Sequence, residues 1–187
     1  IPTADLLRPF AYSFGPLALN YGALGATIGH EFMHAFDVLS LKSFDFEHLQ
    51  DKEALLKEYT KRAVCLRNSH RSVLSTTGGE DKLNYTVDNE NLADLVGAKI
   101  AYQAFASLTS PERTETLAGL DLSSEQLFFV NYCVVWCAQH SQSPEKYAPF
   151  RSRCIVPLMN MPEFSSAFRC AAGTLMNPAK KCDFWLK

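Results

Sequence analysis

The sequence lacks the features typical of nucleic-acid-binding, membrane-spanning and repeat proteins. The 187-residue chain has no concentrated block of Lys or Arg and a formal net charge of -2, so the electrostatic footprint of a nucleic-acid-binding protein is missing. Its longest apolar runs, such as residues 127–138, are too short to span a bilayer, so we expect no membrane segment. No internal repeat or low-complexity tract is present. A hydrophobic content of 47% predicts instead a single folded domain over residues 1–187.

An initiator methionine and a signal-like segment are also missing, because the chain begins at Ile1. This start predicts a mature or excised part of a longer protein. The six cysteines do not form paired CxxC motifs, so we expect a disulfide framework, which forms in oxidising compartments. Asn84-Tyr85-Thr86 is an N-glycosylation sequon. Together these features predict a secreted or extracellular glycoprotein, glycosylated at Asn84.

Hydrophobic periodicity predicts a mostly helical domain with little sheet. Apolar residues four apart (Leu24, Ile28, Phe32 and Phe36) predict a helix over residues 20–38, whose glycines at 22, 25 and 29 would admit another backbone. An amphipathic pattern predicts a surface helix over residues 51–67, followed by a loop over residues 68–85. Further helices are expected over residues 87–108, from a capping box at Ser123 and Gln126 to Cys137, and over residues 162–168.

The most specific motif is the HExxH sequence His30-Glu31-Phe32-Met33-His34. On one helix both histidines project from the same face and can bind one zinc ion, while Glu31 reaches a zinc-bound water as general base. Catalytic zinc usually has three protein ligands, and Glu90 is the best third ligand. Asp94 lies one turn beyond Glu90, where it can accept a hydrogen bond from a ligand histidine. The pattern predicts one Zn²⁺ per chain in a metallopeptidase.

Weaker signals surround this motif. Asp37, three residues after His34, fits equally a partner of a ligand histidine or a charge at the helix end. No ligand-type neighbours accompany His48, His70 or His140 at the required spacing. We therefore expect these three histidines to lie on the surface.

The sequence resembles the neprilysin and endothelin-converting-enzyme family of zinc metallopeptidases. The resemblance rests on strings that occur in family order from residue 19 to the C-terminus: Leu19-Asn20-Tyr21-Gly22, residues 28–37, Glu90-Asn91-Leu92-Ala93-Asp94, Gln126-Leu127-Phe128-Phe129, Trp136-Cys137, residues 160–164, Phe168-Arg169-Cys170, Met176-Asn177-Pro178, Lys180-Lys181-Cys182 and Trp185. It implies a thermolysin-like (gluzincin) helical half-domain, equivalent to the C-terminal part of the catalytic region. It also implies an ectoenzyme that cuts peptides on the amino side of hydrophobic residues.

For individual residues, the resemblance implies the same three metal ligands, the same general base and the same aspartate partner of a ligand histidine that the HExxH motif and the acidic cluster predict. It adds Arg153, eleven residues before Phe164, as a substrate-binding arginine, although Arg151 is close by. Among the cysteines, it implies a bridge between Cys65 and Cys182.

The remaining cysteines have less support from the resemblance. Those at 137 and 170 would have upstream partners in the family, or could pair with each other or with another chain. Cys133 and Cys154 have no family counterpart. A bridge between these two would join the helix of Trp136 to the strand or loop that carries Arg153.

The substrate side departs from the family pattern. The family has a histidine in a His-Ser-Pro string that donates a hydrogen bond to the oxyanion of the tetrahedral intermediate. Here the equivalent is Gln142, in a Gln-Ser-Pro string, or Tyr147, by an ungapped count from Arg153. Either side chain can donate one hydrogen bond, and His140 could do so if its loop folds inward. The family's upstream substrate-binding string and large amino-terminal domain also precede the region matched here, so we expect an upstream domain.

The matching zinc-site residues and the departures on the substrate side lead to two possible functions, each with a peptide or protein as partner. The first is a zinc endopeptidase that hydrolyses small peptides near hydrophobic residues. The second is a zinc-binding but weakly active or inactive secreted protein that acts as a binding or decoy protein. A disulfide-stabilised structural domain without metal is the third and least supported reading.

Overall fold

The computed structural model describes residues 2–38, 40, 52–77, 85–137 and 146–184. Its helices are, in chain order, Thr3–Leu6 (η1, a 3-10 helix), Leu17–Asn20 (α1), Tyr21–Gly25 (η2, a π-helical turn), Ala26–His34 (α2), Lys52–Thr77 (α4), Tyr85–Ala106 (α5), Ser124–Val134 (α6), Phe150–Met159 (α7) and Pro162–Ala167 (α8). Within these residues, β structure is limited to an isolated bridge between Thr174 and Asn177. The prediction of a mainly helical fold with little sheet is confirmed. Among the described helices, none is long and apolar enough to cross a membrane.

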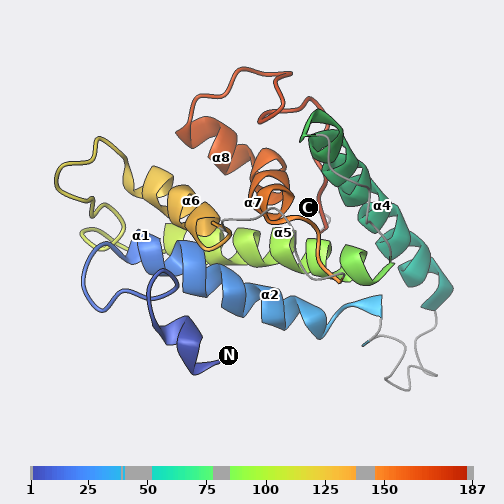
Figure 1. The fold of residues 1–187 in the computed structure, drawn as a ribbon, viewed down its shortest axis with the longest axis horizontal. Coiled ribbons are helices and arrows are strands. Elements are labelled where there is room, and N and C mark those ends of the chain that lie inside the picture. The colour runs from blue at the N-terminus through green and yellow to red at the C-terminus, as the bar shows by residue number, and fades with distance from the viewer. Residues whose placement is uncertain (1, 39, 41–51, 78–84, 138–145, 185–187) are drawn as a thin grey trace.

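Helices α2 and α5 lie side by side through the middle of the molecule (Figure 1) and meet at two glycines. A Cβ atom added to Gly29 would lie 2.8 Å from the backbone oxygen of Gly97. One added to Gly97 would lie 2.5 Å from the backbone nitrogen of His30. Since neither position has room for a side chain, the two backbones are in direct contact. The contact places the HExxH motif against the helix that carries Glu90 and Asp94.

Helix α5 is buried because it contributes to two parts of the core. Its first half packs with α4 and α7, where Leu66 of α4 and Val96 of α5 are both fully buried. Its second half packs with α6 through Phe105 and Phe128, whose rings stack at a centroid distance of 5.7 Å. Residues 91–98 are all buried, as in a helix that is surrounded on all sides.

Helix α4 corrects the prediction of a loop over residues 68–85, because it continues to Thr77. Within this extra part His70, Val73 and Leu74 are buried, and they continue the apolar face of Leu66 at helical spacing. The polar residues between them hid this periodicity. The prediction that His70 lies on the surface is also wrong, since its exposed fraction is 0%.

Helix ends agree with the predictions to different degrees. The capping box at the start of α6 is confirmed: Ser123 Oγ accepts from the Gln126 backbone N–H at 3.2 Å, and Gln126 Oε1 accepts from the Ser123 N–H at 2.9 Å. Helix α6 ends at Val134, earlier than Cys137. Arg153 lies in helix α7 and not in a strand or loop.

Two disulfides connect the helices. Cys65 of α4 is bonded to Cys182, which ties α4 to the C-terminal segment, as the family resemblance implied. Cys133 of α6 is bonded to Cys154 of α7. Cys137 and Cys170 are free thiols in the described structure.

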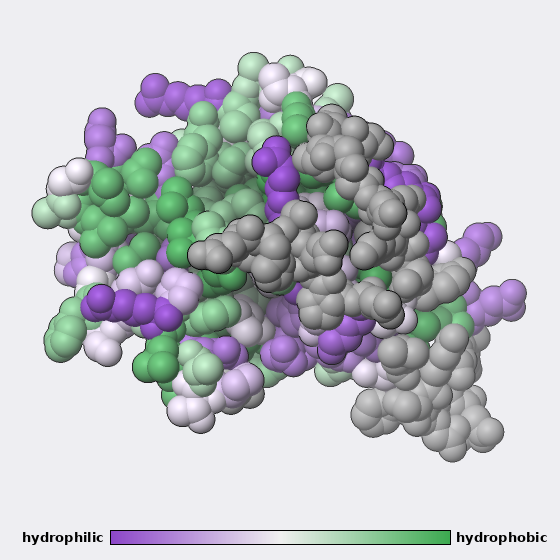
Figure 2. All heavy atoms as spheres, in the orientation of Figure 1, coloured by the Kyte–Doolittle hydropathy of each residue, from purple (hydrophilic) through white to green (hydrophobic). Residues whose placement is uncertain are grey.

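Several large apolar side chains are exposed on the described surface. Phe32 of α2 is 64% exposed and Phe36, just beyond the end of α2, is 55% exposed. The last two of the four apolar residues that predicted this helix are therefore exposed to solvent. Helix α6 exposes Val130 and Val134 in part, and Figure 2 shows apolar atoms gathered over α6 and α8.

Candidate active site

Three potential metal donors converge where α2 meets α5. The Nε2 atom of His30 lies 3.1 Å from Nε2 of His34 and 3.1 Å from Oε2 of Glu90, and His34 Nε2 lies 3.5 Å from the same carboxylate oxygen. Ligands of one tetrahedral zinc ion lie about 3.3–3.6 Å apart, given metal–ligand bonds of about 2.0–2.2 Å. The observed separations are close to this range, so the three side chains fit a single ion.

Aspartates hold the other nitrogens of both imidazoles. His30 Nδ1 lies 2.8 Å from Asp94 Oδ1, and His34 Nδ1 lies 3.2 Å from Asp37 Oδ2. A proton on each Nδ1 would satisfy these contacts and leave each Nε2 lone pair directed at the common point. Asp37, for which the sequence left two roles open, lies in the position of a histidine partner.

Asp94 is itself held by Arg153. Arg153 donates from Nε to Asp94 Oδ2 and from Nη2 to Asp94 Oδ1, both at 2.7 Å. The guanidinium carbon lies 4.0 Å from the ring centroid of Trp136 and 4.5 Å from that of Tyr147. Only 6% of Arg153 is exposed. This bidentate pair, packed against two aromatic rings, fixes the carboxylate that orients His30.

The charges in this cluster stabilise each other strongly. Burial acts to lower the pKa of His30, but hydrogen bonds with Asp94 and Glu90 outweigh it and raise the pKa to about 9. Burial acts to raise the pKa of Glu90, but its hydrogen bonds with His30 and His34 lower the pKa to about 2. Without a metal, protons on the imidazoles thus balance the carboxylates. An ion would replace those protons at Nε2.

A cavity of about 200 Å³ lies beside the donors, and several of the other predicted site residues line it. Glu31, Tyr147 and Arg153 line it together with His30 and Trp136. The structure thus places the predicted base, one of the two oxyanion candidates and the predicted substrate-binding arginine around one space. The other oxyanion candidate, Gln142, lies outside the described residues, as do Asn84, His48 and His140.

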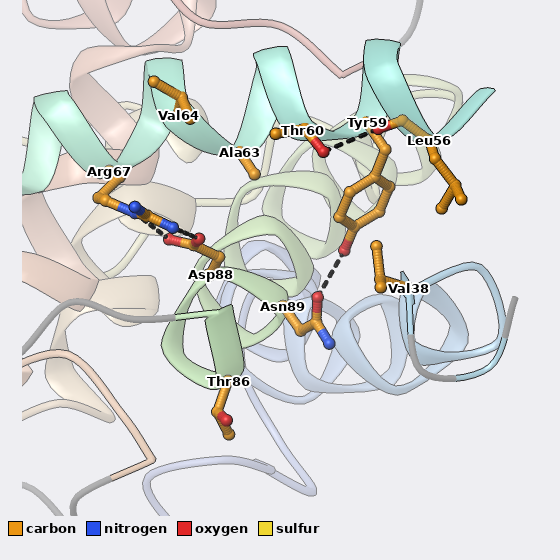
Figure 3. Close-up of a pocket in the computed structure, with 10 residues that line it drawn as sticks. All are labelled: Val38, Leu56, Tyr59, Thr60, Ala63, Val64, Arg67, Thr86, Asp88 and Asn89. Atoms are coloured by element: carbon orange, nitrogen blue, oxygen red, sulfur yellow. Dashed lines mark hydrogen bonds and ion pairs between the residues drawn. The ribbon is translucent and has the colours of Figure 1, made fainter. Parts of the chain in front are cut away.

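A second pocket lies between α4, the start of α5 and Val38 (Figure 3), and has a volume of about 430 Å³. Tyr59 donates to Asn89 Oδ1 at 2.8 Å across it, and Arg67 forms an ion pair with Asp88. The described residues that line this pocket do not include the three donors. Its polar side chains instead connect α4 to the beginning of α5.

Sequence reasoning missed two buried polar side chains in the core. His70 of α4 and Asn91 of α5 are buried, and among the described residues the side-chain nitrogens and oxygens of both have no hydrogen-bond partner. Burial lowers the pKa of His70 to about 3. Helical spacing with Leu66 was the signal that could have placed His70 inside.

His70 is therefore expected to make the fold sensitive to acid. Because the folded-state pKa lies below the unfolded value of about 6.5, stability is complete above about pH 6.5 and is lost as the pH falls toward 3. One proton taken up on unfolding corresponds to about 1.4 kcal/mol per pH unit, so between pH 6.5 and 4.5 the chain should lose about 2.5 kcal/mol more than His70→Gln. Urea unfolding with a chelator present in both samples measures this difference. Equal losses in the two proteins would contradict the prediction.

A helical fold with an HExxH helix against a Glu-bearing helix is the arrangement typical of zinc metallopeptidases. Residues 1–184 match the family described as Peptidase family M13. The chain belongs to this peptidase family.

Curated relatives agree with this assignment. An endothelin-converting enzyme homolog of Locusta migratoria is 35% identical over 206 residues, covering 98% of this chain and 26% of that protein. Neprilysin-1 of Trittame loki is 35% identical over 198 residues, covering 97% of this chain and 27% of the relative. Endothelin-converting enzyme 1 of Mus musculus is 34% identical over 194 residues and covers 98% and 25%. The chain thus spans about a quarter of the length of these relatives.

Solved structures share the fold. PepO from Lactobacillus rhamnosis HN001 superposes with a TM-score of 0.67 and 22% identity, covering 94% of this chain and 27% of that one. A zinc metalloprotease of Mycobacterium tuberculosis in an open state gives a TM-score of 0.69 and 24% identity, covering 95% and 29%. At these identities the likeness supports the fold alone.

Proposed function

We propose that this chain is the zinc-binding part of an endopeptidase that hydrolyses small peptides near hydrophobic residues. The observation that carries the proposal is the convergence of His30 Nε2, His34 Nε2 and a Glu90 oxygen within 3.1–3.5 Å of one another. Two imidazoles and one carboxylate form a donor set typical of catalytic zinc. In this proposal the chain corresponds to the C-terminal part of the catalytic region of its longer relatives.

The side chains around the donors have distinct tasks in this mechanism. Bound Zn²⁺ would act as a Lewis acid that acidifies water and polarises the peptide carbonyl. His30, His34 and Glu90 hold the ion, and Asp94 keeps the His30 ring oriented. Glu31 lines the same cavity, from which it takes a proton from the attacking water and passes it to the leaving amine.

Other residues that line the same cavity provide the substrate contacts. Arg153 uses Nε and Nη2 on Asp94, which leaves Nη1 as its donor for a substrate carbonyl. Gln142 or Tyr147 would take the place of the family's histidine, and Tyr147 is the one that lies among the described residues, where it lines the cavity. A neutral phenol gives one hydrogen bond, whereas losing such a donor altogether costs about two to three orders of magnitude in rate.

The same proposal places the protein outside the cell, where the two disulfides are stable. Asn84 is the proposed glycosylation site. The partner is a peptide substrate, and an upstream domain would complete the cleft.

A secreted zinc-binding protein with little or no peptidase activity is the second candidate. Two observations favour it: neither oxyanion candidate, Gln142 or Tyr147, is the histidine of the family pattern, and Arg153 is bound by Asp94 and only 6% exposed. Zinc binding is common to both candidates, so peptide cleavage distinguishes them.

Metal analysis tests the zinc site on which both candidates depend. The purified chain should contain about one zinc ion per molecule, as expected for a single three-ligand site. His30→Ala should contain none, because two remaining donors hold zinc poorly, whereas the control His48→Ala should match the wild type. Zinc-free wild-type protein would overturn the proposal.

A further inference from the structure

Three residues of one helical region contact the Arg153–Cys154 pair. The hydroxyl of Tyr132 donates to the backbone oxygen of Arg153 at 3.2 Å. The next residue, Cys133, is bonded to Cys154, with the two Cα atoms 4.9 Å apart. One turn later, Trp136 packs against the guanidinium of Arg153. The main chain of Arg153 is thereby fixed to α6, and its side chain to the turn that follows α6.

The position of Arg153 is transmitted to the proposed metal site through two sets of contacts. Its guanidinium binds both oxygens of Asp94 at 2.7 Å, and Asp94 Oδ1 also lies 2.8 Å from His30 Nδ1. An arginine side chain has many rotamers, so contacts that hold it in one geometry determine where its guanidinium lies. Movement of α7 relative to α6 would shift the guanidinium, then the carboxylate, and then the imidazole that presents Nε2 to the ion.

We propose that the Cys133–Cys154 bridge positions Arg153 and thereby sets the metal affinity of the site. The inference rests on the zinc site proposed above. Cys133 and Cys154 are positioning residues, since neither is among the three donors. Tyr132 supports the same geometry through its hydrogen bond to the Arg153 carbonyl oxygen.

A purely structural bridge would behave differently. The two cysteines are 21 residues apart, and a bridge that closes such a loop stabilises a fold mainly by constraining the unfolded chain. Such a bridge would change the free energy of unfolding without changing the site in the folded protein. Cys65–Cys182, which ties α4 to the C-terminal segment, offers a matched comparison in the same chain.

Titration of the full chain with Co²⁺ tests the proposal, because the visible absorption of bound Co²⁺ reports the ligand geometry. Cys133→Ala/Cys154→Ala is expected to bind Co²⁺ about tenfold more weakly, at the lower end of the 10- to 100-fold loss typical when the partner of a ligand histidine is removed. Its absorption spectrum should also change. The control Cys65→Ala/Cys182→Ala should keep the wild-type spectrum and affinity, whatever its loss of stability.

Tyr132→Phe provides a second test that retains both disulfides, and it decides the matter if the double variant does not fold. It should weaken Co²⁺ binding in the same direction and by a smaller factor. Wild-type affinity and spectrum in the folded bridge variant, or equal changes in the two bridge variants, would overturn the proposal. If the wild-type chain bound no Co²⁺ and no zinc, the zinc site itself would be wrong, and this inference with it.

Discussion

Glu31→Gln is expected to lower chelator-sensitive peptide cleavage by about two to four orders of magnitude, the usual contribution of a general base. Glutamine has nearly the same shape as glutamate, but it cannot accept the proton of the attacking water. Glu31 is not one of the three donors, so the variant should still hold about one zinc ion per chain. Cleavage of a peptide library rich in hydrophobic residues, together with metal analysis of the same samples, measures both quantities.

Glu115→Gln is the control for this experiment, since Glu115 is exposed in the connection between α5 and α6. It should cleave at the wild-type rate. A Glu31→Gln variant that retained full activity would exclude Glu31 as the base. If the wild-type chain held zinc but cleaved nothing, the binding or decoy function would be favoured over the peptidase.

Asp94→Ala is expected to destabilise the fold by about 3–5 kcal/mol, the typical effect of breaking a buried ion pair by removing one partner. Arg153 would remain buried without its carboxylate, because the residue is only 6% exposed. His30 would also lose the acceptor for its Nδ1, so zinc affinity should fall by about 10- to 100-fold. Urea unfolding in the presence of a chelator isolates the first effect, and zinc titration measures the second.

Asp183→Ala serves as the comparison, because it breaks the ion pair of Lys99 with an aspartate that is 48% exposed. This change should alter the free energy of unfolding by about 1 kcal/mol or less. Similar unfolding free energies for the two variants would show that the pair between Asp94 and Arg153 contributes no more than a surface pair.

The local features of the chain could largely be predicted from its sequence. HExxH at helical spacing indicates two imidazoles on one face of a helix. Glu90 and Asp94, also four residues apart, indicate two carboxylates on one face of a second helix. The capping box at Ser123 marked the start of α6 because two side chains satisfy backbone donors within one turn. Such signals depend on neighbours in the chain.

Features that depend on tertiary packing could not be predicted in this way. The burial of His70 follows from the contact of α4 with the core; helical spacing with Leu66 was a signal for it, but the sequence does not show that α4 extends this far. Similarly, Arg153 was expected in a strand or loop, but it lies in α7 and stacks between Trp136 and Tyr147, two rings that come from different segments. The spacing of Asp37 from His34 was compatible both with a histidine partner and with a charge at the helix end. Only the structure shows that Asp37 contacts the His34 ring.

The backbone contact of Gly29 with Gly97 brings the three donor side chains together without the help of a metal ion. In small zinc domains the ion gathers ligands that are scattered in an unfolded chain, so binding and folding are one event. Here two helices are already in contact through their main chains, and the donors project from that junction. Little of the binding free energy of an ion would be spent on ordering the chain. Chelation would therefore empty the site and leave the pair of helices folded.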